Sequence, residues 1–283
     1  MTVDLRFSRP ARAPEESWRG RPDSKFATSA GNNAMKNVKG KANYGLDAPG
    51  VVRGLLIGAI VLMPIGWIAA RQSAASQLTW LKPLSSFAFN TGFGCLCGAV
   101  LMLLSSYFGK LRHRDSILSR LHLQSDEILL DVGCGRGLLL IGAAKCLERG
   151  RAVGIDLWSQ TDQSGNSHEA TLRNAEIEGV ADRVEVHKGD MRNLPFTDAT
   201  FNATVAHFAI HNIPSRDGRR EAIREIVRTL KQGGRIALSD LKSVGLYADE
   251  LRRAGMINVK ISGPSFWTWP PSRTVTATKP VSA

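Results

Sequence analysis

A glycine-rich segment at residues 131–137 constrains the fold of this chain more than any other feature. It reads Asp-Val-Gly-Cys-Gly-Arg-Gly and lies between the apolar run 127–132 and the helix-like run 138–150. A strand, a glycine-rich turn and a helix in this order form a site for a polar ligand, because N–H groups at the start of the helix point at the ligand. Glycine also allows positive φ angles and a close approach to the backbone. The segment therefore predicts an α/β ligand-binding unit, although such a turn alone does not identify the ligand.

From about residue 120 onward, short apolar strands alternate with amphipathic helices. Strands are expected at 127–132, 152–156, 183–188, 201–205 and 235–239, helices at 138–150, 168–178, 219–230 and 247–254, and a closing pair of strands at 257–261 and 274–278. This alternation is typical of a doubly wound α/β fold with a mostly parallel sheet.

The spacing of the glycines and acids narrows the choice of cofactor. Dinucleotide-binding folds use Gly-x-Gly-x-x-Gly. Here Gly137 comes one residue early, residue 138 is Leu, and Asp131 lies at the end of the strand. The segment resembles the first motif of class I S-adenosylmethionine-dependent methyltransferases. Two further acids, Asp156 and Asp190, follow the next two strands at the intervals that this resemblance predicts.

The resemblance implies where the cofactor binds and how the sheet ends. The turn would hold the methionine part with Asp131 near its amino group, Asp156 would bind the ribose diol, and Asp190 and Met191 would contact the adenine. The implied cofactor-binding residues are Asp131, Gly133, Cys134, Gly135, Gly137, Asp156, Leu157, Asp190, Met191 and His207. The implied sheet has seven strands, the last two antiparallel.

The resemblance is closest to the small-molecule branch with ubiquinone and sterol methyltransferases, and it is firmest over residues 125–240. Asn202 and Gln232 depart from it, since the family usually has Asp and Pro there. An isolated acid at any of the cofactor positions is more often a helix cap or a turn residue. Several such features in register make that reading improbable for the set.

The residues after the fourth strand are candidates for chemistry, because ligands of an open parallel sheet bind beyond the carboxyl ends of its strands. The candidates are His207, His211 and Asn212. His211 either removes a proton from an attacking hydroxyl or orients it. Alternatively, both histidines hydrogen-bond backbone carbonyls in a packed loop, and the sequence does not decide. Direct in-line displacement needs an aligned acceptor, no metal and no covalent nucleophile.

Two apolar runs at residues 51–70 and 84–108 precede this domain. Each is long enough to cross a bilayer as a helix. Basic residues flank the outer ends of the pair more densely than the connector 71–83, which favours both ends on the cytoplasmic side. Two alternatives remain: a signal peptide beginning at Met35, or two buried helices packed on the domain.

The predicted organisation is a disordered basic tail at 1–50, a two-helix membrane hairpin at 51–109 and the methyltransferase domain at 110–283, with Met35 as an alternative start. The net charge is +12, but no Lys/Arg stripe with interleaved aromatic residues indicates nucleic acid. Two segments are ambiguous. The polar loop 157–170 either closes over the site or is a turn before a helix, and the aromatic segment 266–271 either walls a pocket or packs on the sheet.

These features predict a membrane-anchored methyltransferase that uses S-adenosylmethionine on a small, lipophilic acceptor. Two alternatives remain: a methyltransferase for a soluble small molecule with the hairpin only for location, and a non-catalytic membrane scaffold that retains the fold. The acceptor atom and the oligomeric state are not visible in the sequence.

Overall fold

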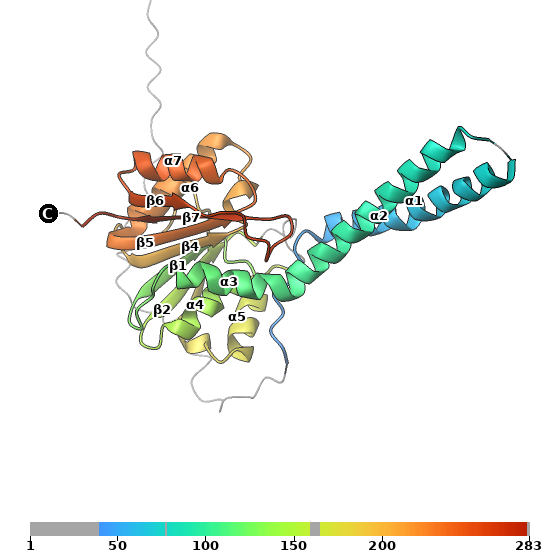
Figure 1. Cartoon of the computed structure of the whole chain (residues 1–283). Helices are drawn as coiled ribbons and strands as arrows, with labels where there is room; N and C mark the ends of the chain where they lie inside the picture. The colour runs from blue at the N-terminus through green and yellow to red at the C-terminus, as the bar shows by residue number, and fades with distance from the viewer. Residues whose placement is uncertain (1–39, 77, 159–164, 282–283) are drawn as a thin grey trace, which may run out of the picture. The chain divides into compact units, whose positions relative to one another are not determined.

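The computed structural model describes residues 40–76, 78–158 and 165–281, and its centre is a seven-stranded sheet (Figure 1). The strands are β1 (Ile128–Val132), β2 (Arg151–Asp156), β3 (Val184–Lys188), β4 (Phe201–His207), β5 (Leu230–Asp240), β6 (Ile257–Ile261) and β7 (Arg273–Thr278). Their order is β3-β2-β1-β4-β5-β7-β6, with β1 to β5 parallel and β7 antiparallel to both β5 and β6. The predicted doubly wound, mostly parallel sheet is confirmed.

Helices cover both faces of the sheet. Helices α3 (Lys110–Ser119), α4 (Leu138–Cys146) and α5 (His168–Ile177) lie on one side, and α6 (Arg216–Thr229) and α7 (Val244–Arg253) lie on the other (Figure 1). The covered central strands are therefore mostly apolar, and Leu129, Leu130, Ala203 and Val205 have no exposed surface. Because these strands are buried, their carboxyl ends have fixed positions, and the polar residues of the candidate site lie at those ends.

The two apolar runs form helices α1 (Pro49–Ser76) and α2 (Leu81–Leu104), which pack against each other. A Cβ atom at Gly66 would lie 2.6 Å from the backbone nitrogen of Phe89, and one at Gly92 would lie 2.8 Å from that of Met63. The glycines thus allow the close backbone approach that is common between membrane helices. Helix α1 is longer than predicted, because residues 71–76 contain no Gly or Pro. Helix α2 begins earlier than predicted, because Pro83 lies in its first turn, where proline is tolerated.

By length and composition both helices could cross a membrane. Only 17% of the apolar window in the first and 22% in the second is buried in the protein. Ile60 and Phe87, for example, are 72% and 70% exposed. The structure thus contradicts the alternative of two buried helices packed on the domain.

The predicted boundary at residues 109 and 110 lies inside a continuous helix. After α2 the chain forms a π-helical turn, η1 (Ser105–Gly109), and goes directly into α3. Gly109 is in close contact with the 266–271 segment, since a Cβ atom there would lie 1.8 Å from the carbonyl oxygen of Trp267. No proline interrupts this stretch, and Gly109 continues the helix instead of ending it.

The part of the predicted disordered tail that the structure describes is not free of contacts; residues 1–39 lie outside the described residues. Tyr44 is buried, and its hydroxyl donates to Glu178 Oε1 at 3.2 Å. Asn43 N donates to Asn174 Oδ1 at 2.9 Å, and Asn174 Nδ2 donates back to Asn43 O at 3.0 Å. The expectation of disorder is wrong for residues 42–47, because an aromatic side chain and paired backbone groups attach them to α5. We name residues 42–47 the strap.

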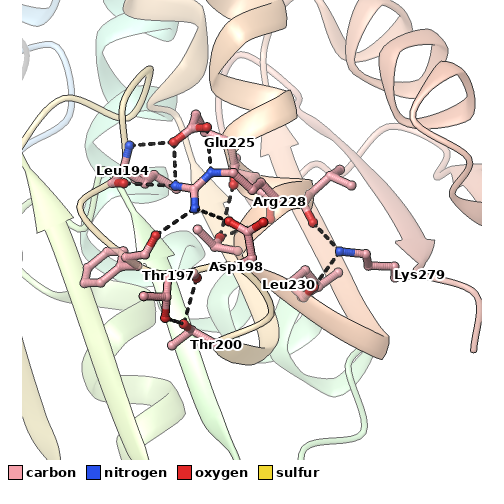
Figure 2. Close-up of polar contacts among 12 residues, drawn as sticks. Leu194, Thr197, Asp198, Thr200, Glu225, Arg228, Leu230 and Lys279 are labelled. Atoms are coloured by element: carbon pink, nitrogen blue, oxygen red, sulfur yellow. Dashed lines mark hydrogen bonds and ion pairs between the residues drawn. The ribbon is translucent and has the colours of Figure 1, made fainter. Parts of the chain in front are cut away.

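A polar network fixes the loop before β4 to the end of α6 (Figure 2). The guanidinium of Arg228 donates to both carboxylate oxygens of Glu225, to Asp198 and to the carbonyls of Leu194 and Phe196, at 2.7–3.0 Å. Figure 2 also shows Lys279, whose ammonium donates to the carbonyl of Leu230 at 2.7 Å. This network lies at the start of β4 and β5, away from the carboxyl ends of the strands.

Candidate functional site

The glycine-rich turn joins the end of β1 to the start of α4. Gly133, Gly135 and Gly137 all have positive φ, at 74°, 51° and 87°. Gly133 N donates to Ile155 O at 2.8 Å, which ties the turn to the end of β2. A Cβ atom at Gly133 would lie 2.2 Å from the Cβ of Ala209 after β4. No other residue fits at position 133, so the turn presents bare backbone to the space in front of the sheet.

Asp156 ends β2 and lies against this turn. Its carboxylate accepts hydrogen bonds from the backbone of Gly135 at 2.8 Å and of Trp158 at 2.6 Å. The hydroxyl of Thr171 on α5 donates to Gly135 O at 2.6 Å. The predicted ribose-binding carboxylate is therefore held in a defined orientation beside the turn.

Asp131 is almost fully buried at the end of β1. The pKa of Asp131 is raised to about 8: burial is the largest cause, a hydrogen bond from the backbone of Leu140 opposes it, and the nearby Asp156 carboxylate adds to it. A carboxyl group with this pKa becomes a strong binding group when a cation reaches it, because the cation stabilises the ionised form.

Asp190 and Met191 follow β3, as predicted. Two guanidinium nitrogens of Arg192 donate hydrogen bonds to Asp190 Oδ2, Nε at 2.9 Å and Nη2 at 2.5 Å. The backbone N–H of Arg192 donates to Asp190 Oδ1 at 2.9 Å. These hydrogen bonds lower the pKa of Asp190. The carboxylate is thus ionised and fixed in direction.

The three residues predicted for chemistry lie at and beyond the end of β4. His207 is the last residue of β4, and its ring stacks on Phe208 at 3.9 Å between centroids. Burial holds the pKa of His207 well below its usual range, so the ring is neutral. Its Nε2 is buried without a hydrogen-bond partner among the described residues. A neutral buried imidazole with one unpartnered nitrogen fits a ligand contact better than a catalytic base.

His211 has a different environment, and it includes residues that the sequence did not indicate. His211 Nδ1 lies 2.6 Å from Oδ1 of Asp240, the last residue of β5. The side chain of Asp240 is 2% exposed and also accepts from the hydroxyl of Tyr247 at 2.9 Å and the backbone of Leu241 at 2.7 Å. For the side chain of Asn212, one hydrogen bond is described: Nδ2 donates to Phe208 O at 3.4 Å. The backbone N–H of His211 donates to Asp240 Oδ2 at 3.2 Å, whereas Nδ1 and Oδ1 are close without the geometry of a hydrogen bond. His211 therefore has an acidic neighbour of the kind that accompanies a proton-accepting histidine.

A single cavity of about 870 Å³ connects these residues. It is lined by the residues after β1, β2 and β3 (Asp131, Gly133, Cys134, Gly135, Asp156, Leu157, Asp190 and Met191) and by those after β4 (His207, His211 and Asn212). Of the predicted site residues, only Gly137 does not line it. The volume is at the upper end of the range for small-molecule sites, roughly 300–1,000 Å³, and provides room for a cofactor beside an acceptor.

Two ambiguous segments now have positions. In the polar loop, residues 159–164 lie outside the described residues. Ser167 caps α5 by accepting from the backbone of Ala170 at 3.1 Å, while Asn166 is buried and lines the cavity. In the aromatic segment, Trp269 and Pro270 line the cavity, whereas Phe266 is 73% exposed. Each segment therefore combines parts of both readings.

The order of the strands and the turn after β1 define the fold of a class I S-adenosylmethionine-dependent methyltransferase domain, and the acids after β1, β2 and β3 lie at one cavity, as the resemblance implies. The comparisons with known proteins agree with this fold. Residues 129–234 match the family model described as a methyltransferase domain, so this part of the chain is a methyltransferase domain. S-adenosylmethionine is its cofactor.

Two curated relatives cover the same part of the chain. A demethylmenaquinone methyltransferase of Lactiplantibacillus plantarum is 33% identical over 130 residues, which are 45% of this chain and 51% of that protein. A sterol 4-C-methyltransferase of Caenorhabditis elegans is 29% identical over 125 residues, 44% of this chain and 34% of that protein. The chain thus matches about half, or less, of the length of these relatives. Among solved structures, the cyclase SpnF has a TM-score of 0.50 at 20% identity, covering 61% of this chain and 82% of that one, which shows the shared fold alone.

Asp131 gives cofactor binding an expected pH dependence. Because the pKa of its carboxyl is about 8 in the free protein, an ammonium group binding beside it at pH 6.5 must displace a proton. The Kd for S-adenosylmethionine should rise about tenfold for each unit that the pH falls below 8, until the pKa of the bound state is reached. Calorimetry at pH 6.5 in phosphate and in Tris should give different enthalpies, because the two buffers take up the released proton with different heats.

The matched control is Asp131→Asn, which has no proton to release. It should bind more weakly and with the same enthalpy in both buffers. Equal enthalpies for the unmodified protein at pH 6.5 would place the amino group away from Asp131.

Proposed function

We propose that this chain is a membrane-anchored methyltransferase that moves a methyl group from S-adenosylmethionine to a hydroxyl-bearing, lipophilic small molecule. One observation carries the proposal: a single cavity is lined by the predicted cofactor residues, by His211, and by Val51 and Met102 at the end of the apolar hairpin next to the domain. Both relatives named above are called methyltransferases of lipophilic molecules, a quinone and a sterol, which supports the choice of substrate class.

The roles of the residues follow from their positions. Asp131, Asp156 and Asp190 orient the cofactor from three adjacent strand ends, and Gly133 leaves room for it. When bound, S-adenosylmethionine supplies an electrophilic methyl group on a positively charged sulfur. His211 accepts the proton of the acceptor hydroxyl at Nε2, because its Nδ1 faces Asp240. The acceptor oxygen would thereby become the nucleophile for direct in-line displacement at the methyl group that the cofactor supplies, and the electron pair of the broken carbon–sulfur bond would stay on sulfur.

Orientation in the membrane follows from charge. Lys41 and Arg53 lie at the start of the hairpin, and Lys110, Arg112 and Arg114 follow it, whereas the connector has Arg71 and Lys82. This asymmetry supports a hairpin with both ends, and hence the catalytic domain, on the cytoplasmic side. S-adenosylmethionine is made inside cells, which agrees with that placement.

The test uses the full chain in phospholipid vesicles with S-adenosylmethionine labelled in its methyl group. Three acceptor sources are compared: a prenylated naphthohydroquinone in the vesicles, a sterol in the vesicles, and an aqueous metabolite extract. Label is expected in the organic phase. Asp156→Ala serves as the control, because loss of a charge-assisted partner should weaken cofactor binding by about 1–3 kcal/mol. Label only in water-soluble products would favour a soluble substrate, and cofactor binding without transfer to any of the three sources would favour the scaffold.

A further inference from the structure

The wall of the cavity on the side of the hairpin is made by the hairpin itself. The first residues of α1, Pro49–Val51, the last part of α2 at Met102, and Ser105 of η1 all line it. Because α1 and α2 are antiparallel neighbours, the start of one and the end of the other lie together. We name Val51, Met102, Ser105, Trp269 and Pro270 the foot of the cavity.

The aromatic segment 266–271, which contributes Trp269 and Pro270 to the foot, is held against the hairpin by several contacts. Trp269 N donates to Ser105 Oγ at 2.9 Å, and the carbonyl oxygen of Trp267 lies against Gly109. The guanidinium of Arg112 lies 5.0 Å from the ring centre of Trp267. Segment 266–271 is therefore attached to the turn at which the apolar helix enters the domain.

Exposed aromatic rings surround this junction. Tyr107 and Phe108 on η1 and Phe266, Trp267 and Trp269 on the attached segment are all exposed to the surroundings. Aromatic rings with basic neighbours such as Arg112 are typical of the boundary between the hydrocarbon core and the headgroups. Under the proposed membrane topology, these five aromatic residues mark the depth at which the hairpin leaves the bilayer.

The cavity changes character along its length. The residues of the foot are apolar apart from Ser105, and Val51 and Trp269 are partly exposed. The ion pair of Lys110 with Asp47, 3.8 Å apart, also lines the cavity beside the foot. Deeper, beyond β4 and β5, it presents His211 and Asn212 beside the cofactor residues. Such a gradient suits an amphiphile whose polar head reacts at depth while its apolar tail leaves through the foot.

We infer that the foot is the entrance through which an acceptor with an apolar tail passes directly from the bilayer to the methyl group, so that the hairpin forms part of the acceptor site. This inference rests on the proposed function, and it narrows the substrate to a bilayer-dissolved amphiphile with a hydroxyl-bearing head. It also distinguishes this chain from a methyltransferase whose hairpin only determines location.

The test introduces a larger side chain at the entrance. Val51→Trp fills the foot from α1, and folding should tolerate it because Val51 is 54% exposed. The matched control is Ile60→Trp on the same helix, which is 72% exposed and does not line the cavity. The full-length variants are compared in vesicles with a prenylated naphthohydroquinone, and in parallel with the same hydroquinone without its tail, added from solution.

Val51→Trp should lower the ratio of kcat/KM for the prenylated acceptor to that for the tail-less one by about tenfold, the effect of one misfitted side chain in an apolar pocket. Ile60→Trp should leave this ratio unchanged, and calorimetry should show an unchanged Kd for S-adenosylmethionine in both variants. A photoreactive residue at Val51 should also crosslink to the prenylated acceptor more than one at Ile60.

Two outcomes would contradict the inference that the foot is the entrance for the acceptor. One is an unchanged ratio in Val51→Trp, and the other is equal crosslinking at both positions. Both leave the proposed function intact, because the unmodified protein would still methylate the bilayer-borne acceptor. If the unmodified protein binds the cofactor but methylates only acceptors in solution, the proposed function fails and the entrance fails with it.

Discussion

Replacing His211 with alanine is expected to lower kcat by about 10²- to 10⁴-fold, the usual contribution of a positioned general base. The Kd for S-adenosylmethionine should not change, because His211 is not among the predicted cofactor residues, which follow β1, β2 and β3 apart from His207 at the end of β4. The measurement is label transfer in vesicles at saturating cofactor, with calorimetry for binding. Added imidazole should restore part of the activity of this variant.

Asp240→Asn separates the orientation of the histidine from its chemistry. The variant keeps the size of the side chain but removes the charge that lies 2.6 Å from His211 Nδ1. It should lower kcat less than His211→Ala and leave KM nearly unchanged, and imidazole should not rescue it. A variant His211→Ala with normal kcat would show that the acceptor needs no base, as expected if the two histidines only pack in their loop.

Gly133→Ala is expected to abolish most cofactor binding. The new Cβ would lie 2.2 Å from the Cβ of Ala209, and the residue would keep a φ of 74°. A non-glycine residue in this region costs about 1–3 kcal/mol, and forcing extra volume into a packed site costs about 1–3 kcal/mol more. Because the turn must shift, the Kd for S-adenosylmethionine should rise about 30-fold or more, equivalent to about 2 kcal/mol. Calorimetry and thermal unfolding of the same sample separate lost binding from lost folding.

Gly179→Ala provides the matched control for that experiment. Gly179 also has a positive φ, 69°, but a Cβ atom there would meet nothing within 4 Å. It should reduce the free energy of unfolding by about 1 kcal/mol and leave cofactor binding unchanged. Equal loss of cofactor affinity in the two variants would mean that backbone strain, and not contact with Ala209, controls the turn.

The cofactor half of the site was predictable because its signals are local. Each acid directly follows an apolar strand, and parallel strands bring their carboxyl ends to one edge, so Asp131, Asp156 and Asp190 had to lie together once the strands were recognised. The two apolar helices were equally visible, since length and lack of charge define them.

The acceptor half was not predictable, since it depends on contacts between distant parts of the chain. Asp240 meets His211 because β4 and β5 are in the register that pairs His207 with Ser239, and no local pattern shows that register. A buried Tyr247 hydroxyl on Asp240 is equally invisible. The one available signal was an acid at the end of the fifth strand, at the edge where ligands bind.

Contacts between distant parts of the chain also explain why the sequence did not predict the strap or the helix that joins the hairpin to the domain. The buried ammonium of Lys110 donates to the backbone carbonyls of Tyr44 and Gly45. A lysine at the start of a domain is usually a solvated residue, and only the folded chain shows that it holds residues 66 positions earlier. Composition likewise indicated disorder for residues whose order comes from α5.

The contacts of the strap have a consequence for biogenesis. Asn43 and Asn174 are 131 residues apart, and the chain between them includes the whole hairpin and the glycine-rich turn. A ribosome extends the chain by about 5–20 residues per second. Under the proposed topology, both apolar helices can therefore enter the bilayer several seconds before α5 exists to receive the strap. The enzyme would be assembled on the membrane in two stages, with insertion first and closure of the domain around its own N-terminal segment second.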